Sequence, residues 1–311
     1  MAIGQIRAAA RPVATQAPAK ARATAAAKAP ALASDSFRPG DVKVITYNTA
    51  IGNPKIKTDQ KDFTKLPFYQ AALKNAPGAP ILCLQEVGNA QRDEVKRLAA
   101  SGQFHVFSQA VGLRGRQNNM VVIPKRYEVV SYKSDRYGFE HVKAFAKKAW
   151  GWVKSLGKEK LNISQMTEPR GFQQLTLKDT VTGKTFSVFN THTSYYEDIK
   201  VAHNKELFDA PKQAAKQHPV IVAGDLNTRT AETDDPNEHW DDQSRAQQGE
   251  FKDMGPKGPL PKKTNIDWVL AQGFDSVSSK VYTGDSISLP GSPDALTVSD
   301  HYAEEDVLRF K

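Results

Sequence analysis

Residues 220–229, VIVAGDLNTR, combine a short apolar run with polar residues where the run ends. The Val and Ile residues are typical of a buried β-strand, and such a strand has no need of an acid or an amide at its end. Gly224 would let the backbone pass close to a neighbouring group. Asp225 and Asn227 could direct a carboxylate and an amide toward one bound group. An Asx turn that closes the strand is the alternative interpretation.

The composition predicts a globular protein with an affinity for polyanions. The chain has 311 residues, of which 39% are hydrophobic, enough for one large domain or two small ones. The formal net charge of +9 favours contact with nucleic acid or with an anionic membrane surface. The single cysteine, Cys83, excludes a disulfide within the chain. No run approaches the roughly 18 apolar residues of a transmembrane helix, so we expect a soluble protein.

Residues 1–35 differ in composition from the rest of the chain. They are basic, rich in Ala and Pro, and contain no acid before Asp35. The segment lacks the continuous apolar core of a signal peptide, so we expect a cytoplasmic protein or one exported without such a peptide. Its composition cannot bury enough apolar surface to order itself, which predicts a disordered tail before a folded domain at 36–311. A targeting tract or a basic arm for polyanions is the alternative.

The apolar pattern of the remaining chain predicts many strands with helices between groups of them. Strands are expected at 41–50, 81–87, 104–107, 119–123, 127–132, 220–223, 266–270 and 306–310, and a hairpin at 171–177 and 184–191. Helices are expected at 66–75, from Asn89, at 139–156, at 197–217 with Pro211 as a potential break, and after Pro236. This order favours two packed sheets with helices outside.

Residues 139–156 show the clearest helical periodicity. Phe139, Phe145, Trp150 and Val153 fall on one face, and lysines occupy the rest. Two interpretations stay open: an outer helix whose apolar stripe packs on a sheet, and a basic amphipathic helix that contacts an anionic membrane.

Six of the predicted strands are followed by polar residues. Each of these residues has a structural explanation by itself, as a turn former, a helix cap or a buried histidine. Together they indicate a functional site, because sites are assembled from loops at one edge of a sheet. The residues are Asn48, Glu86, His192, Asp225 with Asn227, Asp267, and Asp300 with His301.

This set of side chains suits phosphoester hydrolysis. A phosphodiester repels anionic nucleophiles, so hydrolysis becomes easier when a divalent ion neutralises oxygen charge and fixed donors meet the developing charge. Mg²⁺ prefers oxygen ligands and keeps several waters, so one or two carboxylates suffice. An imidazole whose pKa is raised by a nearby acid can carry a proton near neutral pH. The chain has no Cys–His cluster with zinc spacing, so zinc is not expected.

The motifs GDLN at 224–227, IDW at 266–268 and SDH at 299–301 resemble those of the endonuclease/exonuclease/phosphatase superfamily. Its members include deoxyribonuclease I, exonuclease III, the neutral sphingomyelinases and inositol polyphosphate 5-phosphatases. The resemblance covers residues 36–311. It implies metal-dependent phosphoester hydrolysis and a four-layer α/β/β/α sandwich of two mixed, mainly antiparallel sheets flanked by helices. Ala50 stands where the exonuclease III branch carries an acid, which with His192 places the chain nearer the deoxyribonuclease and sphingomyelinase members.

The resemblance also implies a metal site and a water-activating acid. Glu86 would be the principal ligand of Mg²⁺, for which Mn²⁺ may substitute, and Asn48 and Asp300 would complete the site. Asp225 would align or deprotonate the attacking water. Asn227 would bind the scissile phosphate.

Two histidines and three further residues receive roles from the same resemblance. His301 would contact or protonate phosphate oxygens while Asp267 holds its ring. His192 would lie near the leaving oxygen. Arg170 would bind a phosphate, and Asn190 of the NTH motif is assigned to the substrate-binding group.

These expectations predict a nuclease that cuts DNA, with RNA as a further substrate. The alternative is a lipid phosphodiesterase or a phosphoinositide phosphatase. Arg114 and Arg116 in LRGRQNN could reach a nucleic-acid backbone, or could be exposed loop charges. A binding module that has kept the fold and lost turnover is a third interpretation, which the complete set of motif acids and histidines disfavours. A monomer is favoured.

Overall fold

The computed structural model describes residues 37–50, 62–74, 78–112, 117–138, 146, 149–150, 153–154, 169–229, 238–256, 266–283, 299 and 301–311. The chain divides into two units, Met1–Asp35 and Ser36–Lys311, and the fold belongs to the second unit. The predicted disordered tail and most of the predicted helix at 139–156 lie outside the described residues.

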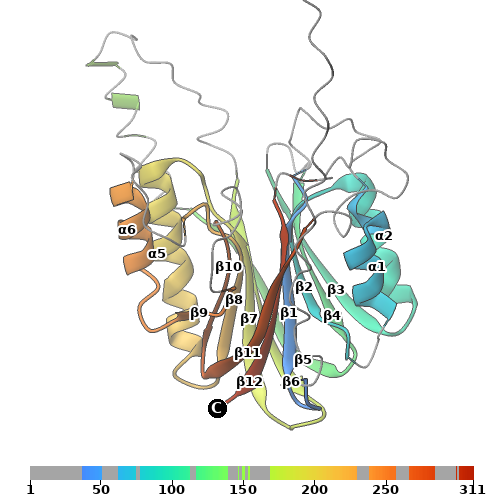
Figure 1. The fold of residues 1–311 in the computed structure, drawn as a ribbon. Helices are drawn as coiled ribbons and strands as arrows, with labels where there is room; N and C mark the ends of the chain where they lie inside the picture. Colours follow the sequence, from blue (N-terminus) through green and yellow to red (C-terminus); the bar gives the residue numbers. More distant parts are fainter. Residues whose placement is uncertain are drawn as a thin grey trace, which may run out of the picture. The chain divides into compact units, whose positions relative to one another are not determined.

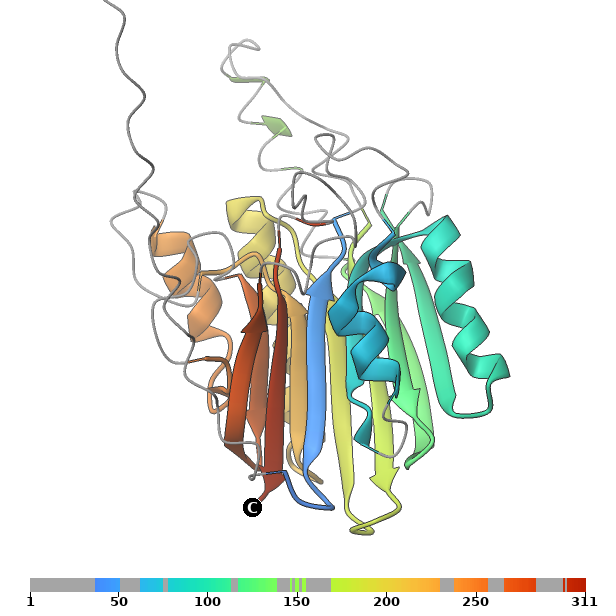
Figure 2. The same ribbon diagram turned by 45° about the vertical axis from the view of Figure 1, so that its right-hand side comes forward.

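Two six-stranded sheets pack face to face at the centre of the second unit (Figures 1 and 2). The first has the order β11-β12-β1-β2-β4-β3, and the second has the order β5-β6-β7-β8-β10-β9. The first contains β1 (Val42–Asn48), β2 (Ile81–Gly88), β3 (Phe104–Val111), β4 (Gln117–Pro124), β11 (Phe274–Tyr282) and β12 (Ala303–Phe310). The second contains β5 (Tyr127–Arg136), β6 (Gly171–Asp179), β7 (Thr185–His192), β8 (Val220–Asp225), β9 (Lys252–Asp253) and β10 (Asp267–Gln272).

Each sheet has one parallel pair near its centre, and its other pairs are antiparallel. β1 runs parallel to β2 in the first sheet, and β7 runs parallel to β8 in the second. The predicted hairpin is confirmed as β6 and β7, with Gly171 opposite His192. Parallel neighbours end at the same edge of a sheet. The ends of β1, β2, β7 and β8 therefore gather at one end of the sandwich.

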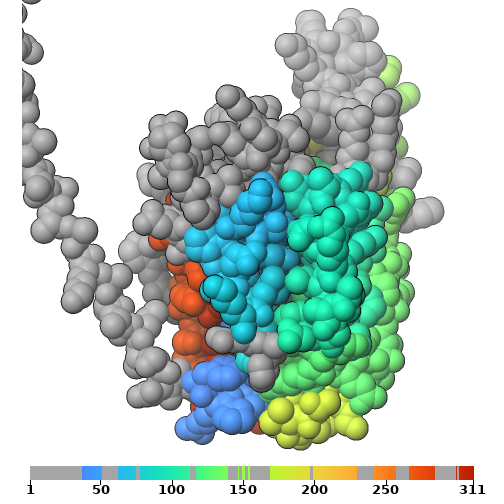
Figure 3. Space-filling view, turned by 90° about the vertical axis from the view of Figure 1, so that its right-hand side faces the viewer, coloured from blue at the N-terminus to red at the C-terminus, as the bar shows by residue number. Residues whose placement is uncertain are grey.

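Helices cover the outer faces of both sheets (Figure 1). The helical turn η2 (Phe63–Lys65), α1 (Pro67–Lys74) and α2 (Asn89–Ala100) lie over the first sheet, and Figure 3 shows this face. α5 (Glu197–Ala214) lies over the second sheet beside α6 (Glu238–Ala246). Pro211 lies inside α5, so the predicted break does not occur. Among the described residues, no helix combines the length and the apolar composition needed to cross a membrane.

The space between the sheets changes character along the strands. On β8, the fully buried Ile221 and Ala223 are followed on the same face by Asp225. On β7, Val188 is followed in the same way by Asn190. We call the first part the apolar end and the second part the polar end, which is the upper end in Figure 2, where the β1 arrow points. On these two strands the apolar core between the sheets thus ends before the edge where the predicted site residues lie.

Strands β9 and β11 were not among the predicted elements. The sequence of β11, FDSVSSKVY, is serine-rich and has no clear apolar alternation. It occupies the edge of the first sheet, pairs only with β12 and carries an irregularity between Ser276 and Ser278. An edge strand needs little burial to form, so its sequence carries a weak signal.

Candidate functional site

Asp225 is the point at which the two sheets meet at the polar end. Within its own sheet it lies opposite His192 on β7 and opposite Asp267 on β10. From the other sheet, Asn48 donates a hydrogen bond from Nδ2 to Asp225 Oδ2 at 2.9 Å. Three strand ends that are distant in sequence are therefore joined through one carboxylate.

Gly224 and Asn227 explain how the chain brings Asp225 to this position. Gly224 has a φ of +147°, and a Cβ atom there would lie 2.1 Å from the carbonyl oxygen of Thr191. The expectation that this glycine allows a close backbone approach is confirmed. Asn227, with a φ of +49°, donates its backbone N–H to Asp225 Oδ1 at 2.8 Å. The Asx turn and the convergence of polar groups are therefore both present.

The environment of Asp225 favours its protonated form. The residue is only 1% exposed. Burial, together with the nearby charge of Asp267, raises the pKa of Asp225 to about 7, while His301, Asn48 and the Asn227 N–H act in the opposite direction. A carboxylate with a pKa near neutrality is suited to accept a proton from water.

His301 is held by the neighbouring acid, as the resemblance implied. Its Nδ1 lies 2.6 Å from Asp267 Oδ2, and its Nε2 lies 3.8 Å from Asp225 Oδ2. Ser299 fixes the same turn: its hydroxyl donates to the Asn48 carbonyl at 2.7 Å and accepts from the His301 N–H at 3.0 Å. Asp300, between them, lies outside the described residues.

His192 is at the site, but its protonation differs from the expectation. Arg170 Nη1 lies 2.6 Å from His192 Nε2, which in turn lies 3.4 Å from Asp225 Oδ2. Complete burial, followed by the charges of Arg170 and His301, lowers the pKa of His192 well below its usual range. The prediction of a raised histidine pKa is wrong here because a buried guanidinium adjoins the ring. The lowered pKa favours the neutral form of His192, in which one ring nitrogen accepts a hydrogen bond.

Glu86 reaches the site through an irregularity in β2. The β2–β4 register shifts between Leu84 and Val87, and Glu86 has a φ of +55°. Its Oε1 lies 3.8 Å from Arg170 Nη1, and Gln117 Nε2 donates to its Oε2 at 3.4 Å. Sequence reasoning missed Gln117, although the residue belongs to the LRGRQNN segment that was singled out for its arginines.

The acids at this site fit a divalent cation. One donor atom from each of Asp225, Asp267 and His301 lies within 4.8 Å of the others. Asp267 Oδ1 is buried and has no hydrogen-bond partner, an arrangement that a cation would satisfy. Oε1 of the predicted ligand Glu86 lies 3.8 Å from His192 Nε2, and that nitrogen lies 3.4 Å from Asp225 Oδ2. Asn48 uses its Oδ1 to accept from the Ala50 N–H at 2.9 Å.

Asn190 lies in the buried layer between the sheets, where both its amide atoms have partners. It is completely buried, and its Nδ2 donates to the Met120 carbonyl at 3.0 Å and to Gln173 Oε1 at 3.0 Å. Its Oδ1 accepts from Gln85 Nε2 at 2.8 Å. The substrate-binding role assigned to it therefore has no support in its position. The other two predicted substrate contacts, Arg114 and Arg116, lie outside the described residues.

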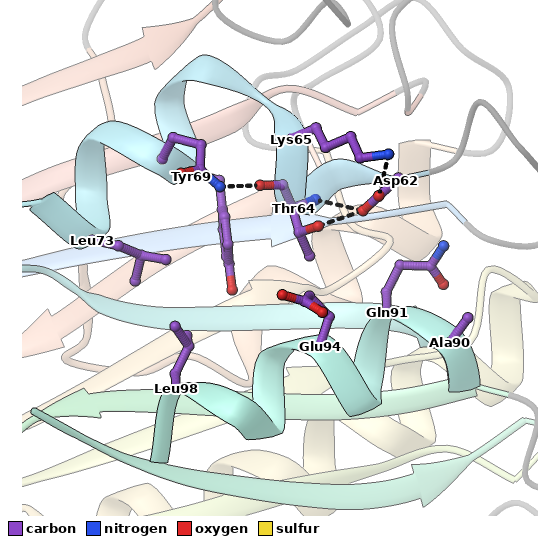
Figure 4. A pocket seen from close by; sticks show the side chains of 10 residues that line it. Asp62, Thr64, Lys65, Tyr69, Leu73, Ala90, Gln91, Glu94 and Leu98 are labelled. Carbon is purple, nitrogen blue, oxygen red and sulfur yellow. Dashed lines mark hydrogen bonds and ion pairs between the residues drawn. The ribbon is translucent and has the colours of Figure 1, made fainter. Parts of the chain in front are cut away.

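A groove of about 640 Å³ lies apart from these residues, between η2, α1 and α2 (Figure 4). Tyr69 and Leu73 of α1 face Leu98 of α2 across it. Burial, followed by the charges of Glu94 and Asp62, raises the pKa of Tyr69. None of the strand-end residues lines the groove.

Comparisons with known proteins agree with this geometry. The model of the endonuclease/exonuclease/phosphatase family matches residues 45–301. Among solved structures, the endonuclease/exonuclease/phosphatase from Bacteroides vulgatus aligns with a TM-score of 0.61 and 16% identity, covering 87% of this chain and 99% of that one. The catalytic domain of human Nocturnin with bound sulfate gives a TM-score of 0.59, 16% identity, and 88% and 96% coverage.

A third solved structure is D. rerio TDP2 complexed with a single-strand DNA product. It aligns with a TM-score of 0.55 and 12% identity over 86% of this chain and 99% of that one. The predicted architecture of two mixed sheets flanked by helices is confirmed by these likenesses. No curated protein sequence matches the chain.

Proposed function

Because the chain belongs to the endonuclease/exonuclease/phosphatase family, whose members are phosphoesterases and nucleases, we propose that it is a Mg²⁺-dependent phosphodiester hydrolase that cuts DNA and accepts RNA. The observation that carries this proposal is the position of Asp225. Its carboxylate contacts Asn48 and His192 and lies beside the His301–Asp267 pair. A proton acceptor with a pKa of about 7 thus adjoins a histidine held by an acid.

Each residue then has a task that follows from its contacts. Asp225 orients the attacking water and takes its proton. Asp267 accepts from His301 Nδ1, so His301 presents Nε2 to the phosphate and its leaving oxygen. Arg170 supplies a fixed positive charge for the phosphate oxygens, and neutral His192 holds that guanidinium in place. Asn227 has its Nδ2 on the Thr193 carbonyl at 3.0 Å, so it contacts phosphate only if that bond is exchanged.

Mg²⁺, or Mn²⁺ in its place, would be held by Glu86 with Asn48 and Asp300, as predicted from the sequence, and would neutralise phosphate charge. Asp225, Asp267 and His301 offer a further group of donor atoms that lie within 4.8 Å of one another. The donor set contains no thiolate, which favours such a hard cation over a soft one.

The charge of the chain supports nucleic acid as the substrate. A net charge of +9 attracts a polyphosphate backbone with salt-dependent affinity. This attraction acts before any contact with bases, so we propose cleavage with little sequence preference.

The test is conversion of supercoiled plasmid to nicked and linear forms with Mg²⁺, with and without a chelator. We expect His301→Ala to lower the rate by about 10²-fold or more, because the residue that contacts the leaving oxygen is lost. His218→Ala is the matched control, since His218 Nε2 bonds Ser187 Oγ at 2.7 Å at the apolar end. Intact plasmid after prolonged incubation of the pure chain would reject the nuclease proposal.

One observation favours a second candidate, a phospholipid phosphodiesterase or phosphoinositide phosphatase at an anionic membrane. Trp150 and Val153, on the apolar face predicted for 139–156, are 63% and 54% exposed. At these positions the face does not pack on a sheet. Lys154 Nζ lies 5.7 Å from the centre of the Trp150 ring, which pairs an aromatic side chain with a cation. Flotation with anionic vesicles tests this: Trp150→Ala should reduce binding, and absence of both binding and phosphocholine or phosphate release removes the candidate.

A further inference from the structure

The loop that follows β7, residues 193–196, is fixed directly to the turn that carries Asp225. The Thr193 N–H donates to the Asp225 carbonyl at 2.9 Å, and the Thr193 carbonyl accepts from Asn227 Nδ2 at 3.0 Å. Tyr195 is two residues further along the chain, and two residues of extended backbone span about 7 Å at most. The backbone of Tyr195 therefore lies close to Thr193, at the edge of the candidate site.

Tyr195 and Tyr196 form a stacked aromatic pair in this loop. Their ring centres lie 4.3 Å apart with an angle of 30° between the ring planes, and the Tyr195 hydroxyl donates to the Tyr196 hydroxyl at 3.0 Å. Tyr195 is 45% exposed, whereas Tyr196 is half-buried. Because the two side chains stack and also bond through their hydroxyls, each holds the ring of the other in one orientation. The loop thus exposes a flat aromatic ring in a fixed orientation beside the site.

Buried residues hold the backbone of the loop in place. The Ser194 N–H donates to His203 Nδ1 at 3.1 Å, and the Tyr196 N–H donates to Ser194 Oγ at 3.1 Å. His203 is completely buried on α5 and stacks on Tyr137, with ring centres 4.4 Å apart. A surface that is already ordered loses little conformational entropy when a ligand binds. The exposed ring is therefore preorganised for binding.

A nucleobase is the ligand whose chemistry fits this ring. Every base has a flat π-face, so stacking on an aromatic side chain stabilises any of the bases. In a duplex both faces of a base are covered by its neighbours, so only an unpaired or flipped-out base can offer a face to the ring. A lipid headgroup or an acyl chain has no flat face that would use the fixed orientation of the rings.

On the basis of the nuclease function proposed above, we propose that Tyr195 binds substrate by stacking on an unpaired base next to the scissile phosphate, with Tyr196 holding the ring in position. The substrate class is then single-stranded nucleic acid and unpaired segments of duplexes. Negatively supercoiled plasmid favours strand opening, so it is a substrate as well. Because stacking does not depend on base identity, this site agrees with cleavage that has little sequence preference.

The test is binding of a fluorescent single strand of about 12 nucleotides, and of the same strand in a duplex, to the full-length chain. Fluorescence anisotropy gives both Kd values, and a chelator keeps cleavage from consuming the probes. Tyr195→Ala should shift the ratio of the two Kd values by about tenfold against the single strand, because only the unpaired base loses its stacking partner. An equal loss of affinity for a single strand of abasic nucleotides would overturn base stacking, in favour of a contact with the sugar–phosphate backbone.

Two further variants separate the ring from its hydroxyl and from its position. Tyr195→Phe keeps the ring and should retain most of the affinity for the single strand, because stacking does not need the hydroxyl. Phe37→Ala is the matched control, since Phe37 is an aromatic residue with 39% exposure that precedes β1, at the opposite end of that strand from Asn48. It should leave the ratio of the Kd values unchanged.

Cleavage of the single strand with Mg²⁺ is followed separately, so that the two proposals can fail independently. If wild type cuts nothing while Tyr195→Ala still shifts the Kd ratio, the nuclease function fails and the stacking role of Tyr195 stands. If wild type cuts the strand and Tyr195→Ala changes neither the Kd ratio nor KM, the stacking role is overturned and the nuclease function stands. Loss of binding to anionic vesicles in Tyr195→Ala, with an unchanged Kd ratio, overturns the stacking role in favour of a membrane contact.

Discussion

The apolar and polar ends of the sandwich are built from the same strands and differ only in position along them. On β8, Ile221 and Ala223 complete the core, and Asp225 begins the site on the same face. On β2, Cys83 is followed by Gln85. The apolar end supplies most of the buried hydrophobic area, which stabilises the fold. The polar end holds acids, amides and histidines, whose burial does not by itself stabilise the fold. The difference teaches that the site is an extension of the core, rigid because its strands are anchored below it.

The buried polar groups between the sheets fall into two sets with opposite solutions to burial. Around Asn190 the groups are neutral amides, and they bond to one another and to backbone carbonyls. Around Asp306 the groups are acids whose oxygens have no partner. Paired amides fix positions, whereas unpaired acids require a proton or a cation. The neutral amides around Asn190 and the buried acids around Asp306 thus lie on different strands.

The sharpest way to separate the two ends is to change Asp225. Asp225→Asn keeps the shape of the side chain but removes the proton acceptor, so we expect plasmid cleavage to slow by about 10³-fold. We expect only a modest change in stability, because removal of a buried charge next to Asp267 is offset where the new amide Nδ2 faces a donor, either Asn48 Nδ2 or the Asn227 N–H. Rate and Tm are measured on the same preparation.

Asp275→Asn, on the exposed edge strand β11, is the matched control and should leave the rate unchanged. If Asp225→Asn were to unfold the chain while leaving the rate per folded molecule intact, the polar end would be structural after all.

The acids of β12 should make stability depend on pH in a way that the amides do not. Folding raises the pKa of Asp306 from 3.8 to about 7. Between these values the folded chain keeps a proton that the unfolded chain has lost, so stability falls as pH rises from 4 to 7. At pH 8, Asp306→Asn should raise the free energy of unfolding by up to about 4 kcal/mol, and at pH 4 by little. Urea unfolding at both pH values measures this, and a pH-independent effect would refute it.

Removal of one of the amides around Asn190 should lower the free energy of unfolding by an amount that does not depend on pH. Asn190→Leu keeps the volume but removes the bonds that Asn190 makes to Gln85 Nε2, Gln173 Oε1 and the Met120 carbonyl, while Gln85 Nε2 keeps the Cys83 carbonyl at 3.0 Å. We expect a loss of about 3 kcal/mol in the free energy of unfolding at every pH from 5 to 9. Urea unfolding across that range checks it, and a loss below about 1 kcal/mol would show that water replaces the amide.

Much of this contrast could be predicted from sequence because polar residues after apolar runs break the pattern of a buried strand. Asn48, Asp225 and Asp267 were identified in that way, and β8 and β10 bring the last two side by side. The lowered pKa of His192 could not be predicted, because it depends on Arg170, which is distant in sequence and adjoins the ring only after folding.

The buried acids of β12 were missed for a different reason. Three consecutive acids, Glu304 to Asp306, are typical of an exposed segment, so the strand was predicted to begin only at Asp306. The buried position of Asn190 was not predicted, because the NTH motif shows which residues occur together and gives no information on which face each one occupies. These side chains are buried only because the two sheets pack together, and that packing cannot be inferred from the sequence around each residue.

The smallest expected effect comes from the apolar end of the same strand that carries Asp225. Ile221→Val removes one methylene group from a completely buried position between the sheets. We expect a loss of about 1 kcal/mol in the free energy of unfolding, and a cleavage rate per folded molecule equal to that of wild type. The site is anchored through backbone registers at His192 and Asp267, which a missing methylene does not shift. Urea unfolding and plasmid cleavage are measured together. A rate that falls more than about threefold would mean that packing four residues below Asp225 sets its position, and the two ends would then be one cooperative unit.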